Sequence, residues 1–245
     1  MKIDFHTRYN PKTFEGLCTK AIRLGLDALV MSGLPDNHER KYKSLTFFPA
    51  QEVEWVAAME MPSYKSRKDW IANEKEKDQP IVYRGKALVI LPSGRYIGEE
   101  ARLFELLESV RKRGGISVSL HDDTNFPVIV SFEDGNPVYE FDAVMIRPYN
   151  MGDIHSLLTQ PGRVCVAGSN AEDEKGIGVG KAYCEYHTPI HNQSELIELV
   201  KIGTKHELKV FGEMLSSPIR IEQTAKPLTI DESSIKCFVK GILSK

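Results

Sequence analysis

The opening residues of the chain carry side chains that could bind a metal ion or an anion. They read KIDFHTR, with His6 near the end of an apolar strand-like segment and Arg8 two residues later. Side chains two residues apart lie on one side of a strand, so His6 and Arg8 are expected to point the same way. An imidazole can ligate a metal, whereas an arginine stays protonated and binds carboxylates or phosphates. The opening therefore points to either metal chemistry or anion binding.

Four more polar side chains follow segments that look like buried strands. They are Ser32, Glu52, His121 and Asn170. In an α/β barrel the carboxyl ends of the strands form one functional rim. We therefore expect these four side chains to meet His6 at that rim.

The segments that would position these residues alternate between strands and helices, which favours a parallel α/β architecture. Strands are predicted over residues 2–5, 27–31, 45–53, 86–91, 116–120, 143–146 and 164–167. Helices are predicted between residues 10 and 25, over 99–113, around 154–158, and from a capping-box-like start at 192 to about 203. A hairpin is expected over 126–140, with Asp134-Gly135 at its turn. The polar stretch 59–80 has no clean periodicity and is predicted to be an excursion or loop, and the tail 216–245 mixes both signals.

Composition narrows the class of protein. A length of 245 residues fits one large domain, and a net charge of −2 does not indicate nucleic acid, which favours basic surfaces. The four cysteines have no CxxC spacing, so we expect buried thiols in a reducing, cytoplasmic setting. No apolar run is long enough to suggest a membrane span.

Taken in order, the strand ends resemble the motifs of the PHP (polymerase and histidinol phosphatase) superfamily of metal-dependent phosphoesterases. KIDFHTR resembles the DLHxH motif, with Arg8 in place of the second histidine. PAQEVEW resembles the GxE motif and keeps Glu52, and SLHDD resembles the AHP motif and keeps His121. AGSNAE resembles GSDxH, with Asn170 in place of the aspartate and Glu172 in place of the histidine.

Other motif positions of the family have changed. Ser32 begins the segment that replaces the TDH motif, and Lys86 or Ala87 stands for a histidine of the fourth strand. A family glutamate becomes Arg147 if RPYN anchors the alignment, or Met145 if the strand is aligned from Asp142. The resemblance reaches to about residue 185. It implies a PHP-like, distorted (β/α)7 TIM-type barrel within a single domain, 1–245.

For the site, the resemblance implies a divalent metal, zinc or manganese, held by His6, Glu52 and His121. Three ligands can hold one ion but not the family's trinuclear cluster, and the added positive charge also allows that no metal binds. Arg8 and His121 are the expected catalytic residues, with Arg8 steadying a phosphate. The expected anion-binding residues are Arg8, Lys86, Arg147 and Asn170. Arg8 is expected either to form an ion pair with Glu52 or to grip an anion.

Two classes of function follow from this resemblance. One is a metal-dependent phosphoesterase, or its catalytically impaired descendant with a reduced metal site. The alternative is a non-catalytic PHP-like binding or scaffold domain with an anion pocket at its rim. An RNA-associated barrel resembling a ribonuclease P subunit is a weaker third interpretation, supported by fold analogy alone. The expected ligand is a phosphate-containing small molecule or another anion, and no feature indicates a protein partner.

Overall fold

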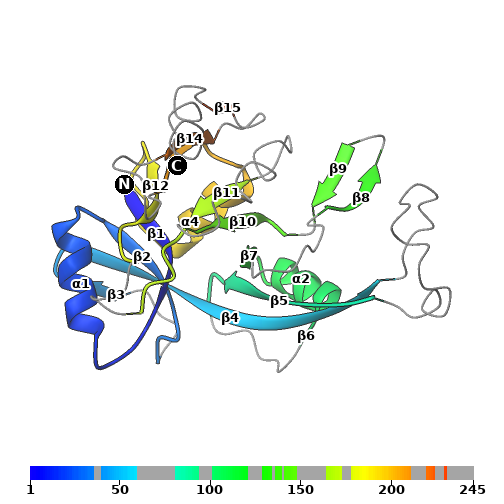
Figure 1. The fold of residues 1–245 in the computed structure, drawn as a ribbon, viewed down its shortest axis with the longest axis horizontal. Coiled ribbons are helices and arrows are strands. Elements are labelled where there is room, and N and C mark those ends of the chain that lie inside the picture. The colour runs from blue at the N-terminus through cyan, green and yellow to red at the C-terminus, as the bar shows by residue number, and fades with distance from the viewer. Residues whose placement is uncertain are drawn as a thin grey trace, which may run out of the picture.

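A computed structural model gives the arrangement of most of the chain (Figure 1). It describes residues 1–35, 40–59, 81–93, 101–120, 129–133, 136–139, 141–147, 164–172, 178–210, 219–223 and 229–230. The helices are α1 (Phe14–Arg23), α2 (Leu103–Lys112) and α4 (Gln193–Lys201). The strands are β1 (Lys2–Arg8), β2 (Ala28–Ser32), β3 (Arg40–Tyr42), β4 (Leu45–Met59), β5 (Ile81–Ile90), β6 (Ala101–Arg102), β7 (Ile116–Leu120), β8 (Ile129–Glu133), β9 (Asn136–Tyr139), β10 (Ala143–Ile146), β11 (Cys165–Ala167), β12 (Ala182–Tyr186), β13 (His206–Val210), β14 (Ile219–Gln223) and β15 (Thr229–Ile230).

Two groups of parallel strands form the frame of the main sheet. β1, β2 and β4 are parallel neighbours, and so are β7, β10 and β11. The connection from β1 to β2 contains α1, as expected for a βαβ unit. Leu17, Cys18 and Ala21 on the buried face of α1 belong to a core cluster that also contains Leu29 and Met31 of β2. This packing confirms the first strand–helix–strand unit predicted from the sequence.

The two parallel groups are joined by antiparallel pairs, which corrects the expected architecture. β5 runs antiparallel to both β4 and β7, and β4 and β5 form a long ribbon (Figure 1). Parallel neighbours require a crossover connection, usually a helix, and the polar sequence after β4 has no helical periodicity that would provide one. The expected parallel architecture therefore holds within each group of strands but not at β5. The described residues form a mixed α/β barrel made mostly of strands, without a clear (β/α)7 repeat.

The sheet nearly closes because the segment after β11 returns to β1. Thr7 forms a parallel bridge to Ala171, the Asn170 N–H donates to the carbonyl of His6 at 2.7 Å, and the Arg8 N–H donates to the carbonyl of Ala171 at 2.8 Å. On the same edge, the first residues of β1 pair antiparallel with β12, and β13, β14 and β15 follow as an antiparallel extension. The closing segment thus brings the carboxyl ends of β1, β2 and β11 together.

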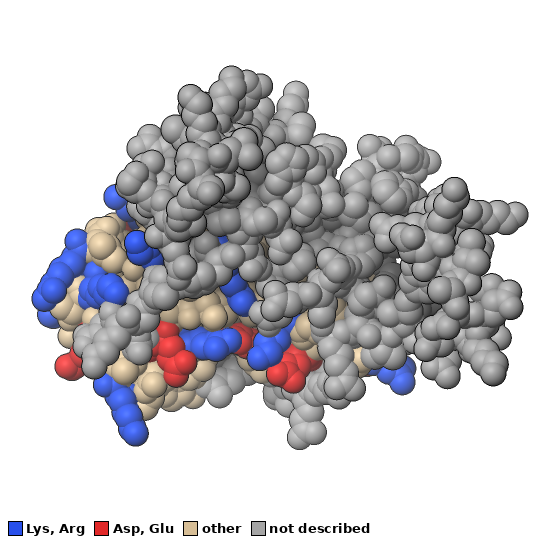
Figure 2. Space-filling view, viewed as in Figure 1, with Lys and Arg blue, Asp and Glu red and all other residues tan. Residues whose placement is uncertain are grey.

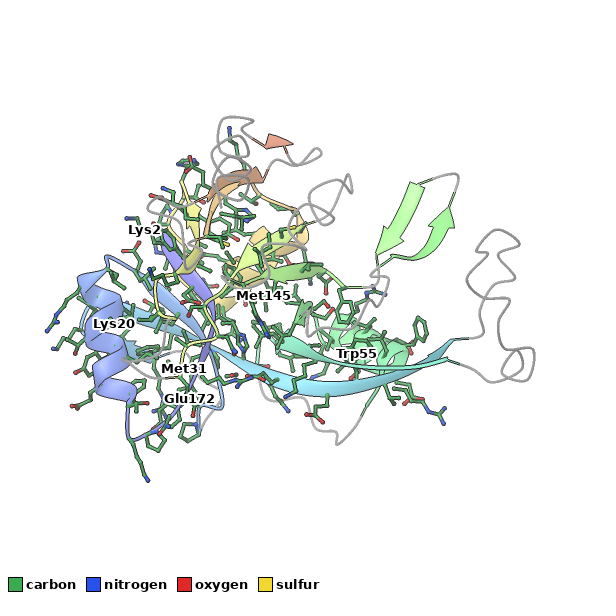
Figure 3. The ribbon with its side chains drawn as sticks, viewed as in Figure 1. Lys2, Lys20, Met31, Trp55, Met145 and Glu172 are labelled. Atoms are coloured by element: carbon green, nitrogen blue, oxygen red, sulfur yellow. The ribbon has the colours of Figure 1, made fainter. Side chains whose placement is uncertain are left out.

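Long apolar side chains fix the β4–β5 ribbon to the barrel. Trp55 of β4 lies between the ribbon and α2 (Figure 3), with its ring centroid 6.0 Å from that of Phe141. A methyl group at Gly85 of β5 would lie 2.4 Å from the Trp55 ring, so only glycine fits opposite the indole. This contact belongs to the larger core cluster, which also contains Leu103 and Leu106 of α2.

Most other predicted elements are confirmed. β7 and β10 have the predicted bounds, β8 and β9 form the expected antiparallel hairpin, and Asn192 caps α4 by accepting from the Glu195 N–H at 2.9 Å. The hairpin turn, residues 60–80 of the expected excursion, the helix near 154–158 and most of the tail lie outside the described residues. Three of the four cysteines, Cys18, Cys165 and Cys184, are buried thiols. No helix in the described part of the chain is long and apolar enough to cross a membrane.

Candidate functional site at the barrel rim

A bulge in β1 sets the direction of the rim side chains. Asp4 pairs with Leu29 and Thr7 pairs with Met31, so β1 advances three residues over the distance in which β2 advances two. Because side chains alternate along a strand, one extra residue moves those beyond it to the opposite face. Arg8, not Thr7, therefore shares a face with its pairing partner Ser32. A regular strand would have turned the arginine away from the rim.

Glu52 of β4 is the centre of the site. Arg8 grips its carboxylate in a fork, with Nε 2.7 Å from Oε1 and Nη2 2.9 Å from Oε2. His6 Nε2 and Ser32 Oγ each lie 3.0 Å from Oε1. Of the two interpretations of Arg8, the ion pair with Glu52 is the one that the structure contains. The side chain of His6 is fully buried, whereas those of Glu52 and Arg8 are 19% and 36% exposed.

These contacts fix the charges in the site. Burial alone would raise the pKa of Glu52, but the hydrogen bonds from His6 and Arg8 outweigh it and hold this pKa well below its usual value. Burial lowers the pKa of His6, the Glu52 carboxylate opposes that shift, and repulsion from Arg147 and Arg8 adds to it. At neutral pH the site therefore contains an ionised Glu52 and an uncharged His6. Since Glu52 can only accept, His6 must carry its proton on Nε2.

Asp4 lies beneath this network and ties β1 to the closing segment. Its Oδ1 accepts from the backbone N–H of His6 at 3.1 Å and from that of Ser169 at 2.9 Å. The side chain is fully buried, and burial raises the pKa of Asp4 to about 7 despite hydrogen bonds that lower it. Asp4 therefore holds the backbone on both sides of the seam that carries His6 and Asn170.

The closing segment needs unusual backbone to approach β1 so closely. A methyl group at Gly168 would lie 2.6 Å from the His6 nitrogen and 2.7 Å from the sulfur of Met145, a β10 side chain labelled in Figure 3. Asn170 has φ of 58°, the left-handed region that asparagine tolerates better than most residues. Its Oδ1 is buried without a hydrogen-bond partner among the described residues. Such a strained residue at a strand end is a candidate ligand-binding position.

The other predicted cations take different positions. Arg147, directly after β10, is close enough to His6 to lower its pKa. Lys86 of β5 instead pairs across the ribbon with Glu54, at 3.5 Å. On the described part of the face in Figure 2, Lys and Arg side chains gather at the left end over α1, whereas toward the middle they alternate with Asp and Glu side chains. The structure thus brings Arg8 and Arg147 near His6, while Lys86 is engaged by the neighbouring strand.

The side chains around Glu52 show whether the divalent metal implied by the family resemblance would fit there. His121 lies outside the described residues. In the described part, no three His, Cys, Asp or Glu side chains are grouped to hold an ion. Both Glu52 oxygens accept from Arg8, and His6 Nε2 faces the carboxylate. As arranged, the described residues do not fit a divalent metal at this position.

Sequence reasoning missed one member of the network, Asp4, and the contact made by another, Ser32. Ser32 was noted at its strand end, but its hydrogen bond to Glu52 depends on the bulge in β1, which no residue pattern signals. Asp4 was not predicted as part of the site, and its Ser169 partner is 165 residues away in the chain. The one available signal was an acidic residue inside an otherwise buried strand.

Comparisons with known proteins rest on structure alone. No protein-family model matches the chain, and a search of curated proteins finds no match. Among solved structures, the lesion-specific endonuclease Q of Pyrococcus furiosus matches with a TM-score of 0.53 and 12% identity, over 85% of this chain and 57% of that chain. A complex of endonuclease Q with a 27-mer duplex containing an abasic lesion gives a TM-score of 0.49 and 12% identity, over 82% and 56%. The chain thus spans somewhat more than half the length of these endonuclease chains. The first match shows a shared fold.

Proposed function

We propose that this chain is a PHP-like domain that binds phosphate esters at its barrel rim and is impaired in metal-dependent hydrolysis. The observation that carries the proposal is the Arg8–Glu52 fork beside the uncharged His6, with Arg147 within electrostatic reach. A phosphoesterase of this type needs metal ions to activate water and to clamp phosphate oxygens. Here guanidinium groups stand near the position where those ions would act, and guanidinium groups also bind phosphates.

The geometry supports an anion as the ligand. Arg8 is held in place through Glu52 while 36% of its side chain is exposed, so an oxyanion can reach a pre-oriented guanidinium. Arg147 supplies a second cation, and Asn170 a polar side chain on the closing segment. The fold of endonuclease Q, described as lesion-specific, makes a phosphodiester of nucleic acid one member of the ligand class to test.

Binding is tested on the intact chain with two probes, a nucleoside 5′-monophosphate by calorimetry and a labelled DNA oligonucleotide by fluorescence anisotropy. We expect saturable, salt-sensitive binding of at least one probe. A charged hydrogen bond contributes about 1.5–3 kcal/mol, so Arg147→Gln should weaken binding roughly tenfold or more. Lys112→Gln, which removes the same charge from the outer face of α2, is the matched control. Absence of binding, or equal loss in both variants, would contradict the proposal.

A second candidate is hydrolysis at a reduced metal site of His6, Glu52 and His121. It is favoured by His6 Nδ1, a buried nitrogen with no hydrogen-bond partner in the described part of the chain. The two candidate functions, ligand binding alone and metal-dependent hydrolysis, are separated by measuring turnover of a generic phosphodiester at increasing concentrations of manganese or zinc. Metal-dependent turnover that His121→Ala abolishes would establish hydrolysis, and binding without turnover supports the impaired domain.

A further inference from the structure

Both oxygens of Glu52 accept hydrogen bonds from the protein itself. Its Oε1 receives three, Arg8 Nε at 2.7 Å and His6 Nε2 and Ser32 Oγ at 3.0 Å, and its Oε2 receives Arg8 Nη2 at 2.9 Å. An ionised carboxylate offers about four lone-pair sites. Three of these donors crowd Oε1 and one reaches Oε2, so a cation could chelate both oxygens of Glu52 only by displacing Arg8.

The arginine also takes the edge of the carboxylate that a chelated ion would use. Its Nε and Nη2 address the two oxygens together, which is the bidentate geometry that matches a planar guanidinium to a carboxylate. Because this guanidinium stays charged at any physiological pH, it neutralises Glu52 permanently. A divalent ion placed on the same edge would meet an immediate positive neighbour.

The Nε2 atom of His6 is excluded as a ligand through the same carboxylate. With Glu52 ionised, the 3.0 Å contact requires a proton on His6 Nε2, and a protonated ring nitrogen has no lone pair to give. The nitrogen that faces Glu52 thus serves as a hydrogen-bond donor.

We infer that the guanidinium of Arg8 substitutes for a divalent cation at the His6–Glu52 position, so that this rim binds its ligand without a metal there. The inference deepens the proposed function and rests on it only for the nature of the ligand. As a consequence, Arg8 is the residue that prevents a divalent cation from binding at the His6–Glu52 position. Removing the guanidinium frees Oε2 and leaves Oε1 with His6 and Ser32 alone, and it allows the proton on His6 to move to Nδ1.

The decisive variant is Arg8→His. It places a second imidazole two residues after His6, on the face that the bulge turns toward Ser32 and Glu52. Together with His6 and the released carboxylate it completes three ligands, enough for a zinc ion with one open position. Arg8→Gln removes the charge without adding a ligand. Arg23→His makes the same replacement at the end of α1 and is the matched control.

Each protein is dialysed against zinc and then buffer, its metal content is measured, and cobalt binding is followed by its visible absorption. We expect wild type and Arg23→His to retain little zinc, and Arg8→His to retain about one ion per chain. Arg8→Gln should fall between them, with a zinc affinity roughly tenfold above wild type. Zinc should raise the melting temperature of Arg8→His but not that of wild type.

Two results would overturn the inference. One is a wild type that retains about one zinc ion per chain and loses it in His6→Gln. The other is a folded Arg8→His that binds no more zinc than Arg23→His. If Arg8→His does not fold, the wild-type measurement and Arg8→Gln decide. If the wild type does not bind phosphate esters at all, that result contradicts the proposed function but does not affect the inference about the metal.

Discussion

The carboxylate of Asp4 accepts a hydrogen bond of 2.9 Å from the backbone nitrogen of Ser169, 165 residues away in the chain. The same oxygen accepts from the His6 N–H at 3.1 Å. One buried side chain therefore links the strand that carries His6 and Arg8 to the segment that carries Asn170. This link makes Asp4 a positioning residue for the rim, and its charge state matters for the fold.

Asp4 should make the fold less stable as pH rises through the acidic range. Burial raises its pKa from 3.8 to about 7, so between these values the folded chain holds a proton that the unfolded chain releases. The penalty is absent below pH 3.8 and complete above about 7. Asp4→Asn keeps an oxygen for both backbone donors but cannot ionise, so it should avoid that penalty.

Urea unfolding of wild type and Asp4→Asn from pH 4 to pH 8 measures this difference directly. The free energy of unfolding of Asp4→Asn minus that of wild type should increase by about 1.4 kcal/mol for each pH unit over the titration range. Asp4→Ala, which loses the oxygen itself, should lose about 1–3 kcal/mol at every pH. A difference between wild type and Asp4→Asn that does not change with pH would contradict the raised pKa.

The Arg8–Glu52 ion pair should contribute measurably to stability. In a double-mutant cycle with Arg8→Gln and Glu52→Gln, we expect a coupling free energy of about 1–3 kcal/mol, below that of a fully buried pair because Arg8 is partly exposed. The Lys86–Glu54 pair is the internal control. Its side chains are 37% and 72% exposed, and its coupling should be no more than about 0.5 kcal/mol.

Acid should remove this coupling. The pKa of Glu52 lies well below its unfolded value of 4.5, so the pair's stabilisation is complete above that pH and is lost only as pH falls toward the lowered folded-state pKa. Equal couplings for the two ion pairs at pH 7 would show that the fork at Glu52 contributes no more than a surface contact.

Local patterns predicted the elements well, and the missing information was long-range. Leu103, Leu106 and Leu107 on one face made α2 predictable, and these residues are buried as expected. The alternation along β5 did not give its direction, because it is the same in parallel and antiparallel sheets, and the available signal was the lack of helical periodicity in the polar sequence after β4. The site shows the same limit: His6 and Glu52 were predicted to meet, but their distance and the fork of Arg8 depend on the bulge between Asp4 and Thr7.

His6 should remain uncharged at a pH where a free histidine is largely protonated. Burial lowers its pKa from 6.5, and the attraction of Glu52 does not reverse that shift. Long-range ¹H–¹⁵N spectra over a pH titration should give a midpoint for His6 below 6.5, with the neutral ring carrying its proton on Nε2. In Glu52→Gln the carboxylate no longer supports a positive charge, so its replacement should lower the pKa further. A His6 that titrates above pH 6.5 would refute this assignment.

Gly168 should tolerate no side chain, because two strands approach it from different sides. In Gly168→Ala the new methyl group would lie 2.6 Å from the backbone nitrogen of His6 and 2.7 Å from the Met145 sulfur. We expect a loss of about 1–3 kcal/mol or more in the free energy of unfolding, together with weaker protection of the Asn170 amide from hydrogen exchange. Met145→Ala added to this variant removes the contact with sulfur but not the contact with backbone. Full rescue by Met145→Ala would therefore show that the backbone of β1 can yield, and that closure of the barrel at His6 is looser than the structure indicates.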